Sequence, residues 1–199
     1  MDIPVSKVPR IWFKKFANKN HQGHIALCSP VDFVNIEEEV ARLFESGKTP
    51  LLLALDNISD VRNFGAILRS AEAFGVDMVI IPGKGSAAIN ADAVKTSAGA
   101  IFNLKIGRVN SLRNSLNSLK MSGLQIVCAS ERGQKAHHMI DWNLPSVLVM
   151  GSEEKGVSPD IIKIADQISS IQMIGKTCSL NVSVATGIFL SEILQNREA

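Results

Sequence analysis

The sequence predicts an α/β fold in which a mostly parallel sheet is flanked by helices. Short apolar runs alternate with helical patterns from His24 onward. These runs are apolar throughout, as expected for strands that helices cover on both faces of a sheet. Of the 199 residues, 46% are hydrophobic and 20% are charged, which indicates one folded domain with a short tail.

Each expected element follows from its local pattern. The expected strands are apolar runs bounded by polar or glycine residues: Ile25–Cys28, Leu51–Leu55, Met78–Ile81, Leu104–Ile106, Gln125–Ala129, Val147–Met150 and Ser169–Met173. The expected helices have the helical repeat: Ile36–Ser46, Asn63–Phe74, a short one within Ala91–Ser97, Ser111–Met121, Pro159–Ala165 and Val182–Gln195. Within the second helix, Asn63 is expected as the N-cap and Gly75 as the C-terminal stop.

Two polar residues precede the last helix, which is apolar on most sides and therefore expected to be buried. Asn181 or Ser179 can cap the free backbone N–H groups at its start. One cap is enough for one helix, so the second polar group is available to meet a ligand at the helix N-terminus. Capping and ligand binding are both open at these positions.

Residues 1–23 are expected to form a basic arm, and residues 24–199 the folded domain. Aromatic residues of the arm, such as Trp12, are interleaved with basic ones, a composition that can stack on and neutralise single-stranded nucleic acid. The candidate contact residues are Arg10, Lys14, Lys15, Lys19 and His21. Packing of this arm onto its own domain or onto a partner subunit is an equal alternative.

Several functional classes lack their residues. The cysteines have no CxxC spacing, and His137-His138 with Asp141 lacks the spacing of a helical metal pair, so no metal site is expected. Gly83-Lys84-Gly85 resembles a dinucleotide fingerprint, and with it a Rossmann-type oxidoreductase, but lacks the acidic residue about 20 positions on. No apolar run approaches the ~18 residues needed to cross a bilayer, so a soluble cytoplasmic protein is expected.

Two further segments place polar residues just after apolar strands. One is a strand, loop and helix from Asp56 to Gly75, in which Arg69 either pairs with Glu72 one turn on or meets a ligand. In the other, the strand Val147–Met150 stops at Gly151, and Glu153 follows. A glycine at such a strand end allows a ligand to approach the backbone closely.

These segments resemble three motifs of the SpoU or TrmH-like RNA 2'-O-ribose methyltransferases of the SPOUT superfamily. The matching residues occur in family order: Asn63-x-Gly65-Ala66-Ile67-x-Arg69, Met150-Gly151-x-Glu153-x-x-Gly156, and Ile171-x-Met173 with Ser179-Leu180-Asn181-Val182-Ser183-Val184-Ala185. His21-Gln22-Gly23 also resembles the entry to the catalytic domain in the branch that methylates a guanosine of large-subunit ribosomal RNA. That branch usually carries an additional N-terminal RNA-binding domain, whereas only a short arm precedes His21 here.

The resemblance implies methyl transfer from S-adenosylmethionine to a ribose 2'-hydroxyl, with rRNA preferred over tRNA. It also implies a homodimer and a C-terminal trefoil knot. The implied cofactor-binding residues are Met150, Gly151, Ile171, Met173 and Leu180. The implied catalytic residues are Arg69, Asn63, Glu153, Ser179 and Asn181.

Arg69 matches the family's key catalytic residue. Because arginine almost never deprotonates, we interpret it as a phosphate clamp and an electrostatic partner of the incipient alkoxide rather than as a general base. The third motif departs from the family pattern at Gln172, where proline is usual. This departure and the missing accessory domain leave a non-enzymatic RNA-binding protein of the same fold as the alternative.

Overall fold

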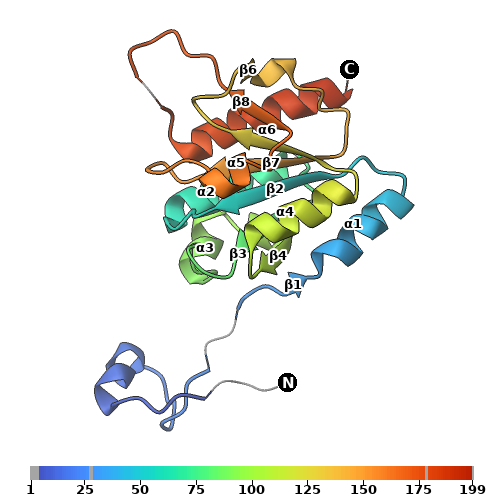
Figure 1. Cartoon of the computed structure of the whole chain (residues 1–199). Helices are drawn as coiled ribbons and strands as arrows, with labels where there is room; N and C mark the ends of the chain where they lie inside the picture. Colours follow the sequence, from blue (N-terminus) through green and yellow to red (C-terminus); the bar gives the residue numbers. More distant parts are fainter. Residues whose placement is uncertain (1–4, 27–28, 178, 199) are drawn as a thin grey trace.

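The computed structural model describes residues 5–26, 29–177 and 179–198, which contain an eight-stranded sheet (Figure 1). All the strand pairs in it are parallel, in the order β1-β4-β3-β2-β7-β5-β8-β6. The strands are β1 Phe33–Val34, β2 Leu51–Asp56, β3 Met78–Pro82, β4 Lys105–Val109, β5 Gln125–Ala129, β6 Lys135–Ala136, β7 Ser146–Gly151 and β8 Gln167–Ser170. The predicted mostly parallel α/β fold is therefore confirmed.

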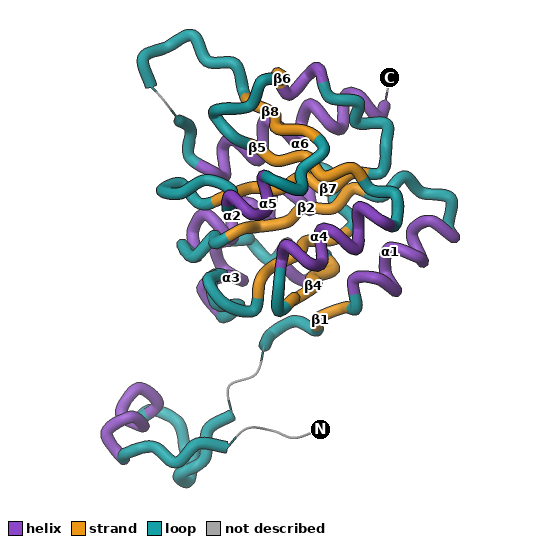
Figure 2. The backbone as a smooth tube through the Cα atoms, viewed as in Figure 1, coloured by secondary structure: helices purple, strands orange, loops and turns teal. Residues whose placement is uncertain are grey.

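Helices cover both faces of the sheet (Figure 2). They are α1 Ile36–Glu45, α2 Val61–Ala73, α3 Ala91–Thr96, α4 Leu112–Met121, α5 Pro159–Ile162 and α6 Val182–Glu198, with 3-10 turns η1 Arg10–Phe16, η2 Ala100–Phe102 and η3 His137–Met139. Alternate residues of β2 point to opposite faces. Leu53 packs in the core formed with α2, α3 and α6, whereas Leu52 packs in the core formed with α1, α4 and α5.

The strand order reverses direction between β2 and β7. On one side of β2 the neighbouring strands are β3 and then β4, in chain order. On the other side the neighbouring strands are β7, then β5 and then β8. In open parallel sheets, ligands bind outside the carboxyl ends of the strands at such a switch point. Asp56 and Gly151 are register partners at these two carboxyl ends, so this is where the fold places a site.

The differences from the sequence prediction lie in the short strands. Residues 25 and 26 of the expected strand Ile25–Cys28 lie in no strand, and residues 27 and 28 lie outside the described part. The two-residue strands β1 and β6 were not predicted, because two residues carry no periodic signal. The strand expected at Ser169–Met173 is β8, Gln167–Ser170. Its ladder with β5 stops at Ser169 and its ladder with β6 stops at Ser170, so Ile171 and Met173 lie in the following loop.

The guanidinium of Arg197, near the end of α6, holds the amino-terminal edge of the sheet. It donates hydrogen bonds of 2.8–3.2 Å to the backbone carbonyl oxygens of Thr49, Pro50, Trp142 and Leu144. Burial lowers the pKa of this guanidinium, and Asp77 partly opposes the shift. Arg197 thus fixes α6 to the loops that precede β2 and β7.

The N-terminal arm extends away from the sheet (Figure 1). Its described part contains η1, where Trp12 and Phe16 lie with ring centroids 5.6 Å apart and Phe13 stacks on His21 at 4.9 Å. The predicted contact residues Arg10, Lys14, Lys15 and Lys19 are exposed. Among the described helices, none is both long and apolar enough to cross a membrane.

Candidate functional site

The loop after β7 is a tight turn that requires glycine at Gly151. A side-chain carbon there would lie 2.0 Å from the backbone carbon of Gly156. The Gly156 N–H donates to the Ser152 carbonyl oxygen at 2.8 Å, and Gly156 adopts a left-handed φ of 66°. The turn holds Glu153 above the carboxyl end of the sheet.

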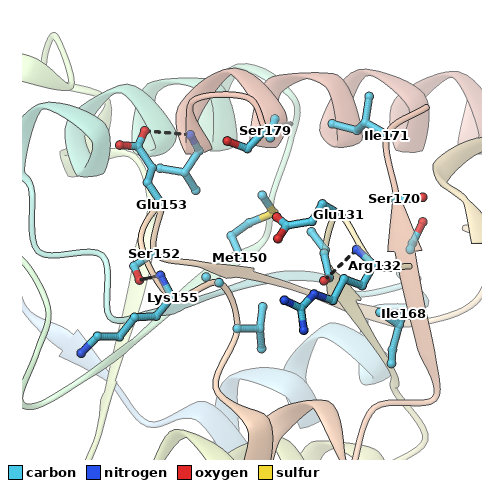
Figure 3. Close-up of a pocket in the computed structure, with 18 of the residues that line it drawn as sticks. Glu131, Arg132, Met150, Ser152, Glu153, Lys155, Ile168, Ser170, Ile171 and Ser179 are labelled. Carbon is cyan, nitrogen blue, oxygen red and sulfur yellow. Dashed lines mark hydrogen bonds between the residues drawn. The ribbon is translucent and has the colours of Figure 1, made fainter. Parts of the chain in front are cut away.

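Glu153 joins this turn to the start of α6. Its Oε1, on the side chain labelled in Figure 3, accepts a hydrogen bond from the Val182 backbone N–H at 3.1 Å. The same oxygen accepts another from the Asn181 side-chain amide. A carboxylate at this position is also favoured by the partial positive charge of the helix N-terminus.

Asn181 caps α6 and bridges to α2 with the same side chain. Its Oδ1 accepts from the backbone N–H groups of Ser183 at 3.0 Å and Val184 at 3.3 Å, so the capping prediction is confirmed for Asn181. Its Nδ2 donates to Asn63 Oδ1 at 3.0 Å as well as to Glu153. Side chains from the three motifs, distant in sequence, therefore form one hydrogen-bonded chain.

The predicted N-cap role of Asn63 is wrong, because α2 begins two residues earlier, at Val61. Asp60 is the cap, and its Oδ1 accepts from the backbone N–H groups of Arg62 at 2.8 Å and Asn63 at 3.0 Å. These bonds, first from Asn63 and then from Arg62, lower the pKa of the Asp60 carboxyl. Capping by Asp60 leaves the Asn63 side chain available for Asn181.

Helix α2 packs closely on α3 through Gly65. A side-chain carbon at Gly65 would lie 2.0 Å from Thr96 Oγ1, which donates to the Val61 carbonyl oxygen at 3.1 Å. This close packing fixes the helix that carries Arg69.

Arg69 stands apart from the hydrogen-bonded chain. Its side chain is exposed and makes no hydrogen bond or ion pair with any residue that the structure describes. The alternative pair with Glu72 does not form, since Glu72 instead accepts from Asn103 Nδ2 at 3.1 Å. Arg69 is thus available to an external anion.

A cavity of about 600 Å³ lies beside the turn after β7 (Figure 3). It falls within the usual size of small-molecule sites, roughly 300–1,000 Å³. All the predicted cofactor-binding residues line it, and so do two of the predicted catalytic residues: Met150, Gly151, Ile171, Met173, Leu180, Glu153 and Ser179. Asn63, Arg69 and Asn181 are not in its lining.

Sequence reasoning missed the loop after β5. Ser130, Glu131 and Arg132 line the same cavity, as does Lys155 from the loop after β7. The rule that ligands gather at the carboxyl ends of parallel strands could have found Glu131 and Arg132, because the strand Gln125–Ala129 was correctly predicted.

Cys128 lies inside the sheet and not in the cavity lining. Burial raises the pKa of its thiol to about 12, with smaller contributions from Asp56 and Asp166. It is therefore a poor nucleophile at neutral pH. His137, in the 3-10 turn η3, is largely buried against Phe189. The described residues contain no group of three His, Cys, Asp or Glu side chains able to hold a metal ion.

The model of the SpoU rRNA Methylase family matches residues 50–191 of this chain. The chain belongs to this family. The matched range includes the three motifs and the whole cavity lining.

Individual SpoU relatives agree with this assignment. A 23S rRNA (guanosine-2'-O-)-methyltransferase, RlmB, of Pseudomonas aeruginosa is 40% identical over 98% of this chain and 79% of its own. An uncharacterized tRNA/rRNA methyltransferase of Mycobacterium sp. (strain KMS) is 40% identical over 99% of this chain, which spans 63% of that protein's length. The SpoU methyltransferase AviRb of Streptomyces viridochromogenes, solved in complex with AdoMet, has a TM-score of 0.70 at 28% identity, covering 76% of this chain and 59% of its own.

Proposed function

We propose that this SpoU family member is a cytoplasmic methyltransferase that moves a methyl group from S-adenosylmethionine to a ribose 2'-hydroxyl of RNA. The observation that carries the proposal is the hydrogen-bonded chain from Asn63 through Asn181 to Glu153, beside a cavity of cofactor size. The names of the relatives support an RNA substrate. The similarity to a guanosine 2'-O-methyltransferase over nearly the whole chain favours rRNA over tRNA.

The cavity suits S-adenosylmethionine in both shape and chemistry. Met150, Ile171 and Leu180 provide an apolar wall for the adenine ring, and Glu131 provides a carboxylate that can accept hydrogen bonds from ribose hydroxyls. When bound, the cofactor supplies an electrophilic methyl group on a cationic sulfonium. The protein then has to align the accepting hydroxyl and manage its proton.

We assign orientation of the methyl donor to residues at the start of α6, and binding of the RNA phosphate and the developing alkoxide to α2. Glu153 and Asn181 fix the start of α6, and Ser179, which lines the cavity, is placed to orient the donor or the ribose. Arg69 on α2 would bind an RNA phosphate and stabilise the developing alkoxide, because a guanidinium stays protonated at neutral pH. Its exposure and its lack of partners among the described residues suit this role.

We also infer a homodimer, with α6 as part of the interface. Val184 on this helix is 51% exposed. It lines a hollow of about 420 Å³ together with Phe74 and Ile188. Ser191, Glu192 and Gln195 also line the hollow. A mixture of apolar and polar side chains of this kind is typical of a surface that another protein covers.

The basic arm would bind RNA alongside this site. Arg10, Lys14, Lys15 and Lys19 are exposed next to the ring cluster of Trp12, Phe13 and Phe16, and His21 stacks on one of these rings. Aromatic rings stack on bases while lysines neutralise phosphates. Binding through phosphates weakens steeply as salt rises.

Arg69→Ala tests the proposal. We expect the wild-type chain to transfer tritiated methyl groups from S-adenosylmethionine to in vitro transcribed 23S rRNA. The variant should lose at least 100-fold in transfer rate while its cofactor affinity, measured by calorimetry, changes less than twofold. Transfer by Arg69→Ala at the wild-type rate would remove Arg69 from the mechanism. RNA binding by a wild-type chain that binds no cofactor would instead favour the non-enzymatic alternative.

A further inference from the structure

Asp56 is a buried carboxylate that no sequence motif singled out. It is the last residue of β2 and is 4% exposed. Its Oδ2 accepts a hydrogen bond from the Ser158 backbone N–H at 2.7 Å, and its Oδ1 accepts one from Asn57 Nδ2 at 2.7 Å. Both oxygens are therefore engaged, one of them by a residue 102 positions away.

No cation offsets this charge among the described residues, since Asp56 takes part in no ion pair there. Asp77 provides a contrast near the opposite end of β2. It also accepts a backbone N–H, that of Leu51 at 2.9 Å, but its other oxygen lies 3.7 Å from Lys48 Nζ. Burial of a carboxylate without a cation is unfavourable, so the hydrogen bonds that Asp56 accepts have to offset this cost, and they point to a role beyond packing.

The bond to Ser158 fixes the far end of the loop that follows β7. This loop leaves the sheet at Gly151, the register partner of Asp56, and carries Glu153. The sheet ladder holds its first end, and Asp56 holds its second end at Ser158. Asn57 strengthens the second anchor, because its Nδ2 also lies 3.4 Å from Ser158 Oγ.

Motion of this loop would reach the proposed site through Glu153. Glu153 Oε1 receives the Val182 backbone N–H and the Asn181 amide, so a displaced loop would pull on the start of α6. The same loop contributes Gly151 and Lys155 to the cavity wall. Asp56 itself is absent from the cavity lining, so it would act through the loop and not by contact with a ligand.

We propose that Asp56 is a positioning residue that anchors the loop of residues 152–158, and through Glu153 the geometry of methyl transfer. This inference rests on the proposed function. The anchor explains why a carboxylate is needed: it offers one acceptor to the loop backbone and a second to Asn57, and carries no donor to oppose either.

Asp56→Asn, with Asp77→Asn as the matched control, tests this inference. An asparagine at position 56 keeps one acceptor, but its NH₂ would face the NH₂ of Asn57 or the Ser158 N–H. We expect hydrogen exchange in residues 152–158 to become at least tenfold faster and kcat for 23S rRNA methylation to fall at least tenfold. The KM for RNA should change less than threefold. Asp77→Asn lies at the amino-terminal end of the strands, away from this loop. It should leave both exchange in residues 152–158 and kcat within twofold of wild type.

The inference is overturned if Asp56→Asn behaves as Asp77→Asn in either exchange or kcat. Melting temperatures of both variants, measured by circular dichroism, show whether a general loss of stability accounts for the effect. Equal melting temperatures with a loss of kcat only in Asp56→Asn would support positioning. If the wild-type chain transfers no methyl group, the proposed function fails, whereas the exchange experiment still decides whether Asp56 anchors the loop.

Discussion

Asn181→Asp separates the capping role of Asn181 from its bridging role. The new carboxylate retains an oxygen for the Ser183 and Val184 backbone N–H groups, so the cap of α6 persists. It has no N–H to donate to Asn63 or to Glu153, and it places a second negative charge beside Glu153. We therefore expect a loss of stability at neutral pH in spite of the nearly identical shape.

The magnitude follows from the distances. Two carboxylate oxygens about 3 Å apart repel by about 1.4 kcal/mol in bulk water, and by about 5.5 kcal/mol at an effective dielectric of 20. Both side chains are exposed, so the lower value applies. Each of the two lost hydrogen bonds adds about 1 kcal/mol. The total of about 3 kcal/mol corresponds to a melting temperature lower by about 6–12 °C for a chain of this size.

The pH dependence identifies the cause. Repulsion by Glu153 raises the folded-state pKa of the introduced carboxyl above its unfolded value of about 3.9. A carboxyl whose pKa is higher in the folded than in the unfolded state lowers the free energy of unfolding least at low pH. This destabilisation grows as pH rises from the unfolded pKa through the folded pKa. The difference from wild type should therefore widen between pH 4 and pH 7. Asn181→Ser keeps a cap and adds no charge, so its difference should stay constant.

The assay is thermal unfolding followed by circular dichroism at pH 4.0 and pH 7.5 for the wild type and both variants. A melting temperature for Asn181→Asp that equals wild type at pH 7.5 would refute the assignment of Nδ2 as the donor to Glu153. A pH-independent loss, equal to that of Asn181→Ser, would refute the electrostatic part of the reasoning.

Three further perturbations test the structure away from this bridge. Arg197→Ala removes the hydrogen bonds to four backbone carbonyls and should lower the free energy of unfolding, measured in urea, by about 3 kcal/mol. S-adenosylmethionine binding should not change. A loss of less than about 1 kcal/mol would contradict this prediction. Gly65→Ala forces α2 away from Thr96 and should lower the melting temperature by at least 5 °C. Ala66→Gly, the control at the neighbouring, partly exposed position, should lower the free energy of unfolding by only about 1 kcal/mol. Because burial raises the pKa of the Cys128 thiol from its ordinary value of 9.0 to about 12, the free energy of unfolding of the wild type should fall by up to about 1.4 kcal/mol per pH unit above pH 9. The measurement is urea unfolding at pH 8 and pH 10. Cys128→Ala should show a smaller fall in the free energy of unfolding between these pH values than wild type, and an equal fall would contradict the burial of the thiol.

The central strands were predicted from the sequence because they are buried along their whole length. Every residue of β2 and of β7 is buried, so Leu51–Leu55 and Val147–Met150 appear in the sequence as unbroken apolar runs. The strand β8 lies near the edge of the sheet, and its length follows from its pairing with β5 and β6 rather than from its own residues. Neither this limit nor the pairing of β1 with β4 can be inferred from local periodicity.

The helix starts show a different limit. Both Asp60 and Asn63 are residue types that cap helices, and local propensity alone does not choose between them. The choice depends on Asn181, which is 118 positions from Asn63 and engages its amide oxygen. Seven of the ten site residues that the motif resemblance implies line the cavity, and the resemblance did not separate them from Asn63, Asn181 and Arg69, which lie outside the lining.

The bridge also explains why the residue at position 181 is an asparagine. Its side chain accepts from two backbone N–H groups of α6 and donates to two oxygens on other segments, which uses both sides of the amide. An aspartate has no donor, and a serine has only one. A glutamine carries the same groups one carbon farther from the backbone, where they no longer suit a cap. The Asn181 side chain therefore joins the first turn of α6 to α2 and, together with the Val182 backbone N–H, to the loop after β7. A shift in either segment would reach the wall of the cavity through these bonds.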